Sequence, residues 1–192
     1  MLDRGLFWSP VPDWSQASIP HEGLSIAALA PQAAWLVSGN LAAFLGRHGV
    51  RFSDAGDRYA LRLAPDRLLF VSMNGADVTA FGWSDGCAVT DVSDSYVLLD
   101  VTGPAALDLM RMGALHDFDA VSDTASAAML FAGQRVIVAR IPQGWRLHVE
   151  RPNAASIWQW LQRAASAWAK PPADASGRSQ SPQLRATQQV AS

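Results

Sequence analysis

A stretch in the middle of the chain constrains the fold most strongly. Residues 96–101 form an almost unbroken apolar and aromatic run, which is typical of a β-strand covered on both faces. Thr102 and Gly103 end the run, and Pro104 suits the first turn of a helix, where its missing N–H is no loss. The stretch therefore predicts a buried strand that leads directly into a helix over residues 104–112.

The surrounding sequence repeats this arrangement of grouped strands followed by a helix. Short runs of apolar residues bounded by turn residues predict strands at 24–29, 33–37, 59–63, 67–71, 87–91, 127–132, 135–140 and 145–150. Helical spacing predicts further helices at 41–48 and from a cap at Asn153 to Trp168, the latter with a stripe of Ile157, Trp158, Trp160, Leu161 and Ala165. Groups of strands with a helix after each group indicate an α+β fold, made of two split β-α-β (ferredoxin-like) halves.

Both ends of the chain differ in composition from this globular region, which we place at residues 23–168. Residues 1–22 contain three prolines, which disfavour regular pairing, so we expect an extended arm. Its tryptophans, Trp8 and Trp14, are buried either by a partner or by the chain's own core. Residues 169–192 have few large apolar side chains and are expected to be a disordered tail.

Composition narrows the classes of function. Charged residues are only 17% of the 192, against about 25% in a typical soluble domain, and there are eight tryptophans, which together favour exposed apolar contact surfaces. The net charge of −2 provides no basic surface for nucleic acid. No apolar run approaches the ~20 residues that span a bilayer, and the N-terminus lacks signal-peptide features, so we expect no membrane association and a cytoplasmic protein.

The histidines and the single cysteine do not form a recognisable site. The four histidines are scattered, and His148, between two apolar strand residues, is interpreted as a half-exposed face residue. His116, near Asp117 and Asp119, is interpreted as part of a polar loop. Cys87 cannot form an intrachain disulfide and is expected to be a small buried apolar residue.

The acidic residues and glycines do not indicate an enzyme either. Asp91 and Asp94, together with Ser93 and Ser95, fit turn chemistry, and Asp100 lies in the apolar strand with no distant carboxylate motif to pair with it. Gly103 before Pro104 is a weak anion site because proline removes a donor. No dinucleotide, Walker or nucleophile-elbow motif is present. We therefore expect no catalytic, cofactor-binding or metal-binding residues in this chain.

A family resemblance rests on the same central stretch. Residues 90–105, which run from Thr90-Asp91-Val92-Ser93-Asp94 to Gly103-Pro104-Ala105, resemble a block in the gamma subunit of the heterotetrameric sarcosine oxidases and in the related small fourth subunit of N-methylglutamate dehydrogenase. Residues 61–71 and 145–161 resemble the strands and helix that flank this block in that family. The resemblance covers residues 24–166 and departs from the family at 71–87, which is shorter and richer in glycine. It implies the folate-binding fold of the glycine-cleavage T-protein.

The resemblance also implies a function. It implies a non-catalytic gamma subunit, with alpha, beta and delta subunits as partners, in a complex that oxidatively demethylates sarcosine and delivers the one-carbon unit to tetrahydrofolate. The cofactors would then lie on other subunits: FAD, FMN, NAD and tetrahydrofolate, with zinc on the small subunit. Two alternatives stay open: a gamma-like subunit of N-methylglutamate dehydrogenase, and a stand-alone folate-binding one-carbon module, which would need a polar pocket for a pterin.

Overall fold

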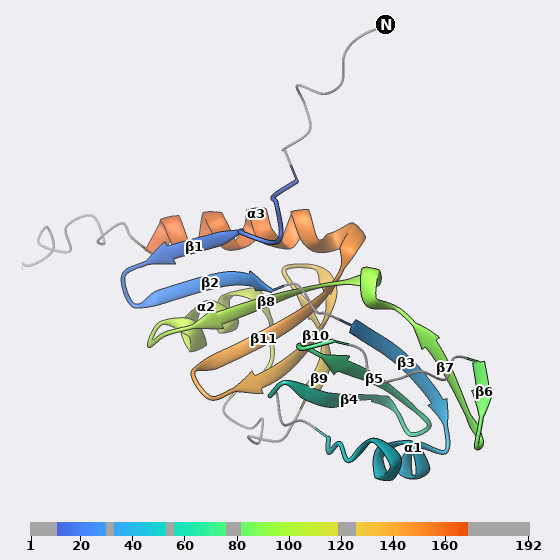
Figure 1. The fold of residues 1–192 in the computed structure, drawn as a ribbon. Coiled ribbons are helices and arrows are strands. Elements are labelled where there is room, and N and C mark those ends of the chain that lie inside the picture. The colour runs from blue at the N-terminus through green and yellow to red at the C-terminus, as the bar shows by residue number, and fades with distance from the viewer. Residues whose placement is uncertain (1–10, 30–32, 53–55, 76–81, 119–125, 169–192) are drawn as a thin grey trace, which may run out of the picture.

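The computed structural model describes residues 11–29, 33–52, 56–75, 82–118 and 126–168. These form two antiparallel sheets and three helices (Figure 1). The larger sheet has, in spatial order, β1 (Ser18–His21), β2 (Leu24–Leu29), β8 (Tyr96–Thr102), β11 (Gly144–Glu150), β10 (Gln134–Ile141) and β9 (Ser126–Phe131). The smaller sheet has β4 (Arg58–Ala64), β5 (Arg67–Ser72), β3 (Ala33–Gly39), β7 (Cys87–Asp91) and β6 (Gly82–Ser84). The helices of the described residues are α1 (Leu41–His48), α2 (Ala106–Gly113) and α3 (Arg151–Trp168), and a 3-10 turn at Ser93–Ser95 precedes β8.

Each sheet contains one split β-α-β unit, as the sequence predicts. In the smaller sheet, α1 connects β3 to β4, and β5 then returns to lie between them. In the larger sheet, α2 follows β8, the β9–β10 hairpin comes next, and β11 lies between β8 and β10. The predicted α+β fold class is therefore confirmed.

Three apolar clusters hold the layers together. The first lies between the larger sheet and the helices α2 and α3, and the second between the smaller sheet and α1. The third lies where the two sheets face each other. The central strand β8 contributes Val97, Leu99 and Val101 to the first cluster and Leu98 to the third, so it is covered on both faces.

The N-terminal segment differs from the prediction. Ser18–His21 pairs with β2, with Pro20 opposite Ser25, although prolines were expected to prevent pairing. The reason is position, because β1 is an edge strand and an edge tolerates the missing N–H of proline. Trp14 packs edge-on against Trp158 of α3, with ring centroids 5.9 Å apart, so it contacts the chain's own core. Trp8 and the predicted tail lie outside the described residues.

Two further differences concern the ends of elements. The helix α3 begins at Arg151, so Asn153 lies inside its first turn and is not the cap. Pro152 occupies the first turn, a position that a helix accommodates because the N–H is unpaired there. The three-residue edge strand β6 was not predicted, since its sequence is too short for an alternating pattern. Among the described helices, none is long and apolar enough to cross a membrane.

Candidate functional site

The facing surfaces of the two sheets hold a buried polar network. Strand alternation directs Asp100 of β8 and Arg146 and His148 of β11 toward the smaller sheet, with Arg146 directly opposite Asp100 in register. Tyr59 of β4 approaches them from the other sheet. The network therefore connects the two halves of the fold through polar side chains in an otherwise apolar interface.

The first part of the network is an ion pair. Arg146 donates from Nε to Oδ1 of Asp100 at 2.7 Å and from Nη2 to Oδ2 at 2.9 Å, a two-pronged geometry that is among the strongest in proteins. The two side chains are only 9% and 16% exposed, and the guanidinium lies 5.6 Å from the centre of the Tyr59 ring. Burial disfavours the charged guanidinium, but the hydrogen bonds and charge of Asp100 together with Tyr59 raise the pKa of Arg146 above its ordinary value.

The second part joins Tyr59 to His148. The Tyr59 hydroxyl lies 2.7 Å from Nε2 of His148, and Nδ1 lies 3.2 Å from the carbonyl oxygen of Ile137. A carbonyl only accepts, so we assign the ring proton to Nδ1, which leaves Nε2 to accept from the hydroxyl. Burial, together with the nearby charge of Arg146, lowers the pKa of His148 to about 3, and burial raises the pKa of Tyr59 to about 12. Both groups are neutral near pH 7.

This arrangement is suited to structure rather than to proton transfer. A general base needs a pKa near the working pH and a free lone pair directed at a substrate. In His148, both ring nitrogens already have partners and the pKa is far below 7. The network therefore pairs most of its buried polar atoms and fixes the relative position of the sheets, while Nη1 of Arg146 is buried without a hydrogen-bond partner among the described residues.

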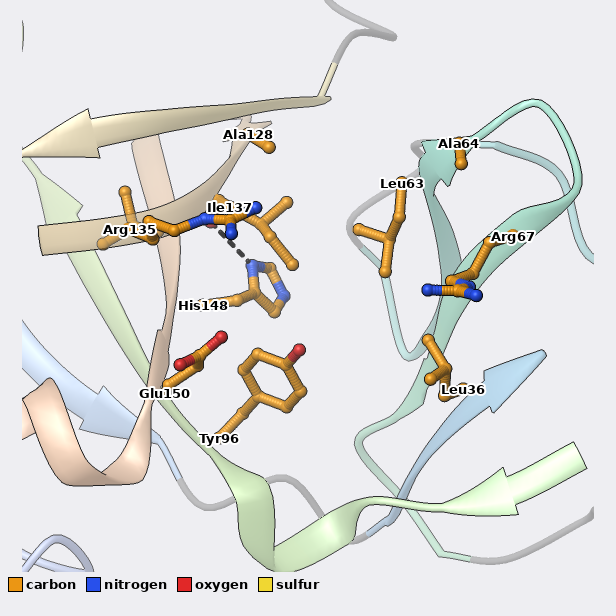
Figure 2. Close-up of a pocket in the computed structure, with 11 residues that line it drawn as sticks. Leu36, Leu63, Ala64, Arg67, Tyr96, Ala128, Arg135, Ile137, His148 and Glu150 are labelled. Atoms are coloured by element: carbon orange, nitrogen blue, oxygen red, sulfur yellow. Dashed lines mark hydrogen bonds between the residues drawn. The ribbon is translucent and has the colours of Figure 1, made fainter. Parts of the chain in front are cut away.

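A pocket of about 320 Å³ lies beside this network, between the two sheets (Figure 2). On the side of the larger sheet it is bordered by Tyr96, Arg135, Ile137, His148 and Glu150, and on the side of the smaller sheet by Leu36, Leu63 and Arg67. The lining mixes apolar side chains with polar ones, and its three charged side chains, Arg67, Arg135 and Glu150, are exposed to solvent. Polar side chains from both sheets border it.

The structure corrects one interpretation made from the sequence. His148 is fully buried rather than half-exposed, because the smaller sheet covers the face of β11 on which it lies. Sequence reasoning also missed the roles of Tyr59, Arg146 and Asp100. The available signal was the alternation of Arg146 and His148 in β11, which places two polar residues on one face of a strand whose opposite face is apolar.

Other candidate residues occupy the positions expected of them. Ser93 donates from its backbone N–H and hydroxyl to Oδ1 of Asp91, at 2.9 and 2.6 Å, which confirms the turn chemistry there. The Cys87 thiol is buried and donates to the carbonyl of Asn40 at 3.0 Å. His116 is exposed, and Asp119 lies outside the described residues. Within the described ranges, no three His, Cys, Asp or Glu side chains gather in a way that could hold a metal ion.

Comparison with known proteins identifies the fold. No family model matches the chain, and no curated protein sequence matches it. Among the similar solved structures is a chain of the heterotetrameric sarcosine oxidase from Corynebacterium sp. U-96, solved in complex with pyrrole 2-carboxylate. The two chains superpose with a TM-score of 0.66 at 19% identity, over 82% of this chain and 91% of that chain. The two-sheet α+β fold described above is therefore shared with a chain of a heterotetrameric sarcosine oxidase.

Proposed function

We propose that this chain is the non-catalytic gamma-type subunit of a sarcosine oxidase-type complex. The observation that carries the proposal is the shared fold, which extends over 91% of the sarcosine oxidase chain and so leaves little of that chain without a counterpart here. The resemblance of residues 90–105 to the gamma-subunit block supports the same assignment. In this proposal FAD, FMN, NAD and tetrahydrofolate are bound by the alpha and beta subunits, and zinc by the delta subunit.

The chemistry of the inter-sheet face supports a scaffold role. The buried Tyr59, Arg146 and His148 side chains are held by one another, by Asp100 and by a backbone carbonyl. Their pKa values keep each group in a single charge state near pH 7. Groups fixed in this way stabilise a fold without taking part in bond making.

Exposed apolar side chains at two sheet edges support assembly with other chains. Trp83 on the edge strand β6 is 75% exposed, and Leu130 on the edge strand β9 is 63% exposed. Large aromatic and aliphatic side chains are costly to leave in water and are frequent anchors of protein interfaces. We assign these two edges to contacts with the partner subunits.

Co-expression with partner subunits tests the proposal. The chain is expressed with alpha-, beta- and delta-type subunits, and the flavin absorbance of each chromatographic fraction is compared with its content of this chain. We expect co-elution with the flavin, and oxidation of sarcosine only by fractions that contain the flavin-bearing subunits. Parallel assays with N-methylglutamate distinguish the two related complexes.

Two results would contradict this function. One is oxidation of sarcosine by the purified chain without companions. The other is a chain that elutes alone under every co-expression condition while the remaining subunits form an active complex of their own.

A further inference from the structure

The pocket between the sheets has features of a ligand site that the scaffold role does not require. Its volume of about 320 Å³ lies at the lower end of the roughly 300–1,000 Å³ typical of small-molecule pockets. The apolar side chains of its lining come from both sheets, with Leu36 and Leu63 on one wall and Ile137 on the other. This space has room for an apolar body of one or two rings, because an enclosed cavity of about 150 Å³ already holds benzene.

Two arginines border this space from opposite walls. Figure 2 shows Arg135, from β10, on the wall formed by the larger sheet, and Arg67, from β5, on the wall formed by the smaller sheet. Neither forms a salt bridge with any residue that the structure describes, and Arg67 donates only a 3.3 Å hydrogen bond to the Ser38 hydroxyl. Two unpaired guanidinium groups on facing walls favour an anion between them, because each presents a planar fork that matches a carboxylate.

Glu150 limits the charge that the pocket accepts. It lies on the same wall as Arg135, and both act on the Tyr96 hydroxyl. The three charged side chains of the lining leave a net charge of +1, which favours a single negative charge on the ligand. The Tyr96 hydroxyl, shown directed into the space in Figure 2, adds a neutral hydrogen-bond donor.

We propose that this pocket binds a small monocarboxylate whose body is one or two apolar or aromatic rings. The carboxylate lies between Arg67 and Arg135, and the ring packs against Leu63 and Ile137. The inference does not depend on assembly with other subunits.

Benzoate is the probe for this proposal, and benzamide, which has the same shape without the charge, is its control. Binding to the full chain is measured by ligand-observed NMR titration. We expect benzoate to bind saturably with a dissociation constant of about 1 mM, as suits so small a ligand, and benzamide to bind much more weakly. Replacing both arginines (R67Q with R135Q) should weaken benzoate binding about five- to tenfold. Replacing two exposed arginines elsewhere (R51Q with R163Q) removes the same charge and should leave binding unchanged.

A second variant is expected to bind benzoate more tightly than the wild type. Misfolding could only weaken binding, so a gain in affinity cannot be mistaken for it. Glu150→Gln removes a like charge from the pocket and should tighten benzoate binding by about two- to fivefold. Equal binding of benzoate and benzamide, unchanged binding in R67Q with R135Q, or weaker binding in E150Q would each overturn the proposal.

Discussion

Protonation of His148 should make the fold sensitive to mild acid. Burial lowers the pKa of His148 from the ordinary 6.5 to about 3. As the pH falls, the unfolded chain therefore takes up this proton before the folded chain does. The stabilisation from the neutral ring is complete above about pH 6.5 and is lost progressively as the pH falls toward 3. At pH 5, 1.5 units below the unfolded value, the loss is about 2 kcal/mol at 1.36 kcal/mol per unit.

Urea unfolding at pH 7 and pH 5 measures this loss. The wild-type chain should lose about 2 kcal/mol of unfolding free energy between these two values, and His148→Gln should lose much less. His116→Gln, at an exposed histidine, is the matched control and should behave like the wild type. If H148Q is too unstable to compare, NMR of the wild-type imidazole should show a neutral ring at pH 5. A protonated ring at that pH, or equal pH dependence in the wild type and a folded H148Q, would refute the reasoning.

Three other substitutions test the packing, the ion pair and the proposed interface. Leu98→Asp should prevent folding, because it places an unpaired charge between the sheets where the native side chain is fully buried; a cooperative thermal melt by circular dichroism would contradict this. Asp100→Asn should destabilise the chain by about 3–5 kcal/mol in urea unfolding, because it leaves the charge of Arg146 buried without its partner; an effect below 1 kcal/mol would show that water reaches the site. Trp83→Ala should leave the melting temperature of the isolated chain unchanged and reduce its co-elution with partner subunits, and a lowered melting temperature would instead assign Trp83 to the fold.

Much of the fold could be predicted from the sequence because its elements are short and have clear ends. The helix α1 and the strands β2 and β7 have the predicted bounds, since apolar runs there stop at turn residues. The segment at 18–21 was missed because proline was weighed as a breaker, whereas at an edge its missing N–H faces outward. Local signals describe a residue's own preference and contain no information on whether its strand lies at an edge.

The polar network was harder to predict because its members are far apart in the chain. Nothing local distinguishes Tyr59 as a partner of His148, and the two meet only when the sheets pack. The sequence interpretation of His148 as half-exposed assumed that one face of β11 meets solvent, but the second sheet covers that face. The pocket depends on the same packing, since Arg67 and Arg135 belong to different sheets.

The pairing of β2 with β8 has a consequence for the order of folding. The strands β2 and β8 are neighbours in the larger sheet, with Leu29 opposite Leu98. The part of the chain between these two strands forms every strand of the smaller sheet. Closing so long a loop costs entropy before any contact compensates for it, whereas the hairpins β4–β5 and β10–β11 need only local contacts. On a ribosome the smaller sheet can therefore assemble as soon as it emerges, while the first strands synthesised remain unpaired on one side until their neighbour arrives.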